Sequence, residues 1–104
     1  MNNFRALNQS IIQYREIKKL KLRGEVRSQI ERAALSVCLN LTEGNARRSQ
    51  KDRRRMFNIA YSSQQEVKTL LIILKQKRIY RNADILGAMI YRLQLSIMQN
   101  QLFL

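Results

Sequence analysis

The absence of proline is the feature that most constrains what this chain can fold into. Its 104 residues contain no proline and only three glycines, so almost nothing in the sequence interrupts a helix. Leu, Arg, Gln, Lys and Ala are frequent, and these residues favour helix. A chain of ~100 residues supports one compact domain. We therefore expect a single all-α domain over residues 1–104.

Two glycines follow apolar stripes with helical spacing in the first half of the chain. The first stripe begins at Phe4 and predicts a helix that ends near Leu22, with Gly24 as its stop. A second helix follows at once and closes at a left-handed stop formed by Gly44 and Asn45. Its core-facing stripe comprises Val26, Ile30, Ala33, Val37 and Leu41.

The second half of the chain predicts two further helices. Ser49 and Asp52 have the form of a capping box, so a third helix starts there and runs to Leu74, with Met56, Ile59 and Val67 in its apolar stripe. Asn82 and Asp84 offer a fourth N-terminus. The apolar face of the fourth helix comprises Leu86, Met89, Ile90, Leu93 and Ile97. Every connection is so short that it must reverse the chain, which predicts an antiparallel up-and-down four-helix bundle.

Two of these helices carry more apolar surface than one bundle needs. The fourth helix has a second stripe roughly opposite the first, formed by Tyr91, Leu95, Met98 and Leu102. The second helix carries Leu35, Cys38 and Leu39 outside its core stripe. A broad core seam is one explanation. A homo-oligomer that buries the second stripes is the better one, because soluble monomers rarely expose patches of this size.

Positive charge is concentrated around the start of the third helix. The chain has 20 Lys and Arg against 7 Asp and Glu, a formal net charge of +13, which favours a polyanionic partner. Cations at a helix N-terminus oppose the macrodipole and repel one another, so local stability does not explain their placement. A phosphate backbone would explain it, and a merely solvated face is the alternative. The cluster comprises Arg47, Arg48, Lys51, Arg53, Arg54 and Arg55.

A basic stripe with one aromatic residue continues along the third helix. It repeats every seven residues over roughly 30 Å, and its members are Arg54, Tyr61, Lys68 and Lys75. Cations follow phosphates, and a tyrosine can stack on an unpaired base, although Tyr61 could equally pack at a subunit boundary. Two more basic groups flank the first and third connections, residues 15–27 and 75–81. We therefore predict a nucleic-acid-binding surface that spans the whole particle.

The composition excludes most catalytic chemistry. The chain has no histidine, which removes histidine proton shuttles, Ser/His and Cys/His nucleophile pairs and histidine-ligated metals. The acidic residues are scattered, so we expect no enzyme, no metal site and no cofactor. Cys38 lies in apolar sequence and is predicted to be a small core residue in a reducing cytoplasm. The longest apolar run, residues 70–74, is far shorter than the ~20 residues of a membrane-spanning helix.

A narrower polar stripe lies on the second helix. It comprises Gln29, Arg32, Ser36, Asn40 and Glu43, spaced by three and four residues. This spacing predicts a structural hydrogen-bond network that fixes the register of the bundle or lines the interior of an oligomer. A binding role is the alternative.

At this stripe the sequence resembles a known family. The motifs Gln-Ile-x-Arg-Ala-Ala at residues 29–34, Asn-x-x-Glu-Gly at 40–44 and Arg-Arg-Ser at 47–49 carry the resemblance, with residues 58–60, Ser63 and Glu66. They are similar to motifs of the four-helix-bundle proteins associated with 23S rRNA intervening sequences. The same superfamily includes the accessory variability determinants of diversity-generating retroelements. The resemblance covers mainly residues 26–75.

The resemblance implies an antiparallel four-helix bundle that assembles into a homopentameric ring without catalytic residues. The chain departs from the family pattern in a shortened first helix and first connection. It also carries Arg53 and Arg54 in place of an apolar or aromatic pair, and Lys68 at an acidic position. The added charge favours a member specialised for nucleic acid.

The leading hypothesis is a ring-forming scaffold that binds RNA or an RNA/DNA hybrid. Within the family, a retroelement accessory factor that binds template RNA and the reverse transcriptase fits the added charge best. A protein of an rRNA intervening sequence that binds ribosomal RNA is the first alternative. A protein-interaction oligomer with an acidic partner is the second. No motif encodes base specificity.

Overall fold

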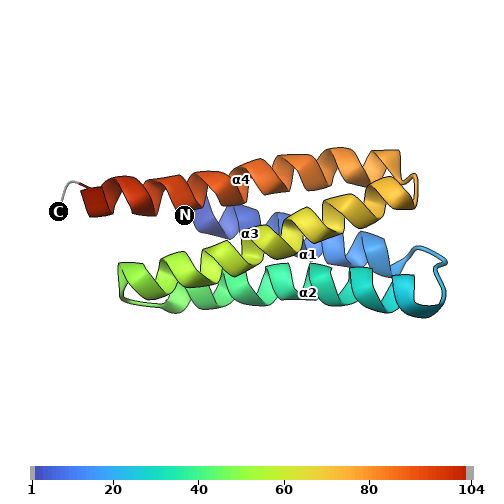
Figure 1. Ribbon diagram of the computed structural model, residues 1–104, viewed down its shortest axis with the longest axis horizontal. Helices are drawn as coiled ribbons and strands as arrows, with labels where there is room; N and C mark the ends of the chain where they lie inside the picture. The colour runs from blue at the N-terminus through green and yellow to red at the C-terminus, as the bar shows by residue number, and fades with distance from the viewer. Residues whose placement is uncertain (1, 103–104) are drawn as a thin grey trace.

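The computed structural model describes the backbone of residues 2–102 and the side chains of residues 5–98. Four helices make up this part of the chain: α1 (Asn2–Lys18), α2 (Gly24–Ala46), α3 (Gln50–Ile73) and α4 (Lys77–Leu102). The connections after α1 and after α3 lie at one end of the molecule, and the connection between α2 and α3 lies at the other (Figure 1). Residues 2–102 contain no strand. The prediction of an all-α four-helix domain is confirmed.

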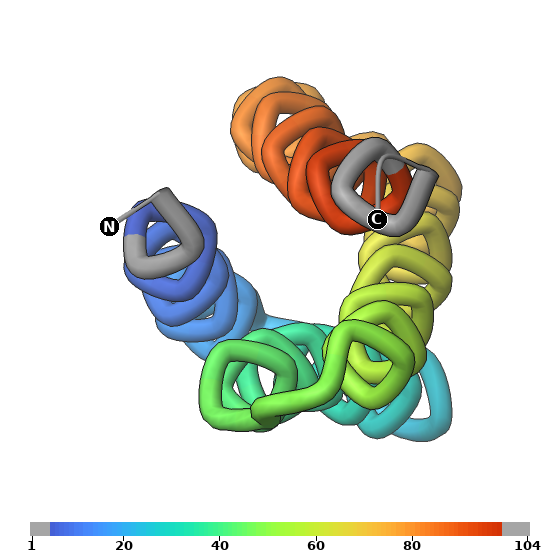
Figure 2. Tube along the Cα trace, turned by 90° about the vertical axis from the view of Figure 1, so that its left-hand side faces the viewer, coloured from blue at the N-terminus to red at the C-terminus, as the bar shows by residue number. Residues whose placement is uncertain are grey.

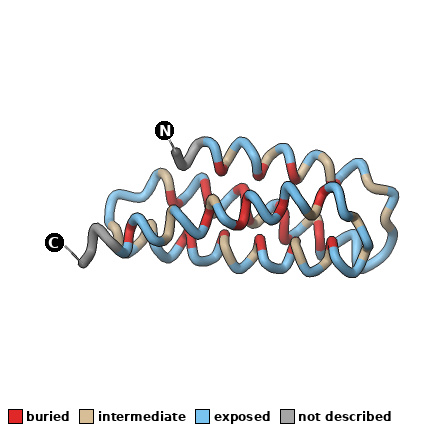
Figure 3. The backbone as a smooth tube through the Cα atoms, turned by 90° about the horizontal axis from the view of Figure 1, so that it is seen from above, coloured by how far each residue is buried: buried red, intermediate tan, exposed pale blue. Residues whose placement is uncertain are grey.

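The helices follow one another around a common axis. Each helix packs against the next one in the chain, and α1 also contacts α4. Viewed along the molecule, α1 and α3 lie on opposite sides, with α2 and α4 between them (Figure 2). The buried residues of each helix gather on the side that faces the other helices (Figure 3). The helices therefore enclose one elongated core.

The core consists of two apolar clusters, one toward each end of the molecule. The first lies toward the α2–α3 connection and comprises Ala6, Val37, Leu41, Phe57, Ala60, Leu86, Ile90 and Ile97. The second lies toward the other end and comprises Ile17, Ile30, Ala33, Ala34, Val67, Leu71, Ile79 and Ala83. Leu86, Ile90 and Ile97 are buried and Met89 and Leu93 pack against them, so the predicted apolar face of α4 is confirmed.

A buried pair of glutamines joins α1, α3 and α4 along this core. Gln13 Nε2 donates to Gln64 Oε1 at 2.8 Å, and Gln64 Nε2 donates back to Gln13 Oε1 at 2.8 Å. Gln64 Nε2 also donates to the carbonyl oxygen of Ala83 at 2.9 Å. Buried amides are tolerated when their hydrogen bonds are made. The pair therefore fixes the register of three helices, and the apolar pattern of the sequence did not predict it.

The first connection differs from the prediction. α1 ends at Lys18, not near Leu22, and Gly24 is the first residue of α2, with φ +67°. Leu20 and Leu22 pack against the second core cluster from within the connection. The helical spacing of apolar residues therefore continues past Lys18, the last residue of α1, so the sequence predicted a longer helix.

Gly44 is not a helix stop. It lies inside α2, which continues to Ala46, and among the described glycines only Gly24 has a positive φ. A Cβ atom at Gly44 would lie 2.4 Å from Cε1 of Phe57, whose ring is fully buried. Glycine is needed here because α3 approaches the backbone of α2 closely, not because the chain turns.

The third connection also differs from the prediction. α4 begins at Lys77, well before Asn82 and Asp84. Lys75 adopts φ 57°, its N–H donates to Ile72 O at 3.0 Å, and the Gln76 N–H donates to Leu71 O at 3.0 Å. These two bonds form a Schellman motif, which ends α3 and reverses the chain at once. The prediction missed it because the usual glycine is replaced by lysine.

Two apolar residues predicted to face the core lie on the outside of their helices. Val26 and Ile59 are exposed, whereas Cys38, predicted to be a small core residue, is buried. Val26 lies in the first turn of α2, where the core has ended. The α3 prediction is otherwise confirmed: Ser49 Oγ accepts from the Asp52 N–H at 3.1 Å, and Met56 and Val67 are buried.

Candidate nucleic-acid interface

The cationic cluster covers the end of the molecule at which α2 turns into α3. Arg47 and Arg48 lie in the connection after α2, Ser49 caps α3, and the other four cations lie in the first two turns of α3. Arg47 forms an ion pair with Glu43 at 3.4 Å. Among the described side chains, Arg48, Lys51 and Arg55 are exposed and make no hydrogen bond or ion pair. These three cations are available to an external anion.

Arg53 is a different kind of cation from its neighbours. Its side chain is half-buried, and the guanidinium carbon lies 6.0 Å from the centroid of the Phe57 ring. Its Nε atom and the Oε1 atom of nearby Gln50 are buried without a hydrogen-bond partner. Arg53 therefore packs over the core beside Gly44 as well as contributing charge. Arg54 is exposed and engaged in an interaction.

The stripe from Arg54 to Lys75 follows the seam between α3 and α4. The ring of half-buried Tyr61 lies 5.9 Å from that of Tyr91, tilted by 50°. Lys68 Nζ lies 2.9 Å from Asp84 Oδ1 and 6.0 Å from the centroid of Tyr80. The hydrogen bond to Asp84 raises the pKa of Lys68 above its ordinary value. Tyr61 and Lys68 are thus engaged within the chain, and Lys75 at the end of the stripe is exposed and unpaired among the described residues.

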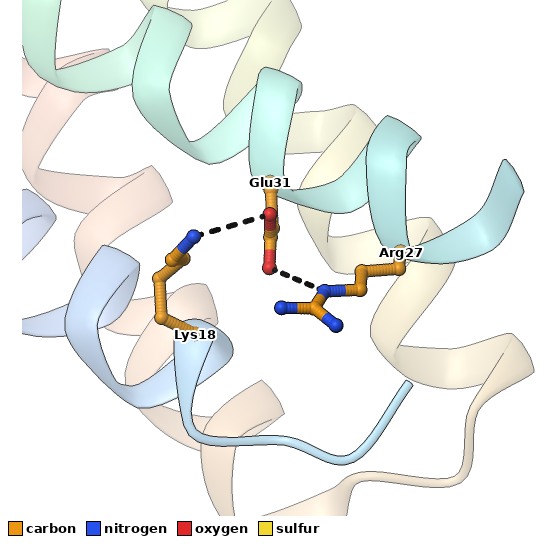
Figure 4. A network of polar contacts seen from close by, with 3 residues as sticks. All are labelled: Lys18, Arg27 and Glu31. Atoms are coloured by element: carbon orange, nitrogen blue, oxygen red, sulfur yellow. Dashed lines mark hydrogen bonds and ion pairs between the residues drawn. The ribbon is translucent and has the colours of Figure 1, made fainter. Parts of the chain in front are cut away.

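The opposite end of the molecule holds part of its positive charge in ion pairs. Glu31 accepts from Lys18 at 3.5 Å and from Arg27 at 3.2 Å, which ties the end of α1 to the start of α2 (Figure 4). Arg78 lies 3.3 Å from Glu16. Exposed ion pairs contribute little to stability, but they neutralise cations. The unpaired cations of this end lie in the last turn of α1, in the connections and in the first turns of α4.

That end also carries a groove that the sequence did not predict. It lies beside the α3–α4 connection and has a volume of about 410 Å³. Leu71, Ile72 and Tyr80 form its apolar wall, and Lys75, Lys77 and Arg81 supply its charge. Its cations belong to the predicted basic group of residues 75–81, and Lys75 also to the predicted stripe of the third helix. Tyr80 was missed because the start of α4 was placed too late in the chain.

The apolar stripes predicted to lie outside the core of one bundle are exposed. Tyr91 is 49% exposed, and Leu95 and Met98 on the same face of α4 are also exposed. The side chain of Leu102 lies outside the described residues. On α2, Leu39 is 55% exposed, with Leu35 beside it. A single copy of the chain therefore leaves two apolar helix faces uncovered.

The polar stripe of α2 forms the predicted hydrogen-bond network only in part, at Ser36 and Asn40, with one bond to α3. The Ser36 and Ser63 hydroxyls lie 2.8 Å apart, and Asn40 Nδ2 donates to Ser36 O at 2.8 Å. Arg32 and Glu66 lie on opposite sides of the same open groove without a hydrogen bond or ion pair. The stripe thus combines hydrogen bonds at Ser36 and Asn40 with one unpaired charge, Arg32, which faces Glu66 of α3 across the groove.

The part of the chain that the structure describes holds no group of three metal-binding side chains. Burial raises the pKa of the Cys38 thiol above its ordinary value, which disfavours the thiolate at neutral pH. The prediction that Cys38 is a core residue is confirmed by its burial. None of the described helices is long and apolar enough to cross a membrane.

Comparison with known proteins gives one match. The model of the 23S rRNA-intervening sequence protein family matches residues 2–100 of the chain. The match is wider than the 26–75 segment whose motifs carry the resemblance in sequence. No curated protein and no solved structure matches the chain.

Proposed function

Because the chain belongs to the 23S rRNA-intervening sequence protein family, we propose that it is a non-enzymatic scaffold that binds RNA through its basic surface. The observation that carries the proposal is the set of exposed, unpaired cations around the N-terminus of α3: Arg48 just before the cap, and Lys51 and Arg55 in the first two turns. They lie near the N-terminus of α3, where the helix dipole makes cations unfavourable. Binding of an external anion would offset this cost and explains their placement.

The chemistry of this surface suits phosphates rather than bases. Arg and Lys side chains contact phosphate oxygens and fix a bound strand without reading its sequence. With a formal charge of +13, the chain attracts a polyanion over a distance and binds it in a salt-dependent way. Arg53 contributes charge from a fixed position because it packs over Phe57. Tyr61 and Lys68 can contribute to RNA binding only if their contacts with α4 break.

Two RNAs are the first to test. The name of the family points to structured ribosomal RNA, so an rRNA stem is the first candidate ligand. The template RNA of a diversity-generating retroelement, bound together with its reverse transcriptase, is the second. The added charges of Arg53 and Arg54, with Lys68, favour this second role. An acidic protein partner is the alternative that the experiments below distinguish.

We also propose that the antiparallel bundle assembles with copies of itself in the cytoplasm, as a ring of five subunits by analogy with the family. The exposed face of α4 formed by Tyr91, Leu95 and Met98, with Leu102, is the proposed contact. Replacing Leu95→Glu together with Met98→Glu introduces two charges there and should yield monomers in light scattering. An oligomer that survives both substitutions would exclude this face as the interface.

The RNA proposal is tested by neutralising the three exposed cations. Arg48→Gln, Lys51→Gln and Arg55→Gln together should weaken binding of a structured RNA at least about tenfold and lower the log–log salt slope by roughly 2 to 3. The matched control is Lys19→Gln, Lys21→Gln and Arg23→Gln, which removes the same charge from the opposite end. Equal losses in both triple variants, or no loss in the first, would refute the site.

A further inference from the structure

The groove beside the α3–α4 connection combines an apolar wall with unpaired cations. Its volume of about 410 Å³ falls within the ~300–1,000 Å³ of typical ligand pockets. Ile72 is 60% exposed although it follows buried Leu71. Tyr80 is half-buried and offers the one aromatic ring of the groove. The described part of the chain leaves Ile72 and part of the Tyr80 side chain open to solvent.

Its cations have no partner within the described chain. The side chains of Lys75, Lys77 and Arg81 are exposed and make no hydrogen bond or ion pair there, and no acidic side chain lines the groove. The first turn of α4 contains no acidic residue either. Three like charges around one small groove repel one another, so an anionic ligand would lower their energy.

The backbone of Lys75 adopts a conformation that costs free energy for any residue other than glycine. Its φ of 57° places it in the left-handed region, at the position of the Schellman motif that glycine usually occupies. A residue with a Cβ atom pays roughly 1–2 kcal/mol for this conformation. Glycine would close the same turn with less strain, so the retained lysine points to a use for its ammonium group.

Tyr80 is held in place from the side of α3. Lys68 Nζ lies 6.0 Å from the centroid of its ring, and Lys68 is itself fixed by the 2.9 Å contact with Asp84. A ring fixed in this way loses little freedom when a flat group stacks on it, which favours binding.

We propose that this groove takes one unpaired nucleotide of an RNA strand. The base lies against Tyr80 and Ile72, and the phosphates on either side of it contact Lys75, Lys77 and Arg81. An aromatic face beside cations is the arrangement that proteins use for unpaired bases. The inference rests on the proposed RNA-binding function but concerns an end of the molecule opposite Arg48, Lys51 and Arg55.

The first test compares a single-stranded oligoadenylate with a fully paired RNA duplex of equal phosphate number. Tyr80→Leu keeps an apolar side chain but removes the ring, and it should weaken oligoadenylate binding roughly 5-fold to 150-fold. Duplex binding should stay unchanged. Tyr14→Leu is the matched control, because Tyr14 is also half-buried with a lysine over its ring but lies outside the groove.

The second test uses Lys75→Gly, which should not impair folding. The variant should melt no lower than the wild type, yet its log–log salt slope for oligoadenylate should fall by about 0.7, the value for one phosphate of a single strand. Lys21→Gly removes the same charge from the α1–α2 connection and should lower the slope less. In methyl NMR, oligoadenylate should shift the Ile72 signal by ring currents and leave exposed Ile12 unchanged.

The outcomes separate the two proposals. If the wild type binds duplex but Tyr80→Leu and Lys75→Gly leave oligoadenylate binding unchanged, the groove proposal is wrong and the scaffold proposal stands. If the wild type binds neither RNA, both are wrong. If phosphatidylglycerol vesicles shift the Ile72 signal and oligoadenylate does not, the groove binds an anionic lipid and the nucleotide proposal is overturned.

Discussion

The α2–α3 and α3–α4 connections have the same length but are built in opposite ways. The first, residues 47–49, ends with Ser49, a favoured capping residue whose hydroxyl accepts from the Asp52 N–H. The second, residues 74–76, places Lys75 at φ 57°, where glycine is favoured. Both are basic, but only the first uses the residue that best stabilises its turn. The difference indicates that charge at Lys75 is retained at a cost in stability.

The largest expected effect concerns the packing of Gly44 against Phe57, beside the α2–α3 connection. Gly44→Ala places a methyl group 2.4 Å from the buried Phe57 ring and should lower the free energy of unfolding by about 2 to 3 kcal/mol, despite the better helix propensity of alanine. Gly87→Ala is the control: its Cβ meets nothing closer than 3.7 Å, so it should stabilise the protein by up to about 1 kcal/mol. Urea unfolding measures both. A stable Gly44→Ala would show that Phe57 can move.

The next effect concerns the glutamine pair within the core. Gln64→Leu leaves the Gln13 amide and the Ala83 carbonyl buried without their partner and should cost about 1 to 2 kcal/mol in urea unfolding. Adding Gln13→Leu removes the second buried amide and should restore part of the loss. Equal stability of the single and double variants would mean that water replaces the missing partner.

The comparison of the two connections is sharpened by a pair of substitutions with opposite signs. Ser49→Ala should lower the free energy of unfolding by about 1 kcal/mol because it removes the cap of α3. Lys75→Gly should raise it by up to about 1 kcal/mol because it relieves the left-handed strain. Thermal melting at one protein concentration measures both. Destabilisation by Lys75→Gly would mean that the lysine side chain stabilises the turn.

The smallest effect is the pH dependence of the Lys68–Asp84 pair. The pair raises the pKa of Lys68 in the folded protein above 10.5, its ordinary value. Its stabilisation is therefore complete below that value and is lost as the pH rises through the folded pKa. Because Asp84 is 61% exposed, the loss should be at most about 1 kcal/mol.

That loss is measured as a difference between two proteins. The gap in unfolding free energy between the wild type and Asp84→Asn should stay constant below about pH 10 and narrow as the pH rises above 10.5 through the folded pKa. The variant corrects for pH effects that do not involve the pair. If this difference in unfolding free energy stays constant with pH, the Lys68–Asp84 pair contributes nothing to stability.

The sequence predicted features that follow from local rules. The absence of proline indicated four helices, the spacing of Leu86 and Ile90 identified the core side of α4, and Ser49 identified the start of α3. Each of these depends on residues close together in the chain. The surplus apolar stripe of α4 was also predicted, and Tyr91 is exposed.

The features that the sequence did not predict depend on contacts between helices. The sequence predicted a turn at Gly44. The actual reason for glycine there is the close approach of Phe57, which lies on another helix and so leaves no mark in the local sequence. The pairing of Gln13 with Gln64 joins residues far apart in the chain and follows no apolar period. Lys75 lacks the usual signature of a helix end, so the start of α4 and the groove at Tyr80 were missed.

The measurement that tests the central claim most directly is RNA binding across a salt series. The protein is first freed of nucleic acid carried over from purification, and a structured RNA is compared with a matched duplex DNA. The account predicts tight RNA binding with a steep log–log salt slope, which means that several phosphates are contacted at once. Weak binding with a shallow slope would contradict it and would point to an acidic protein as the partner of this basic surface.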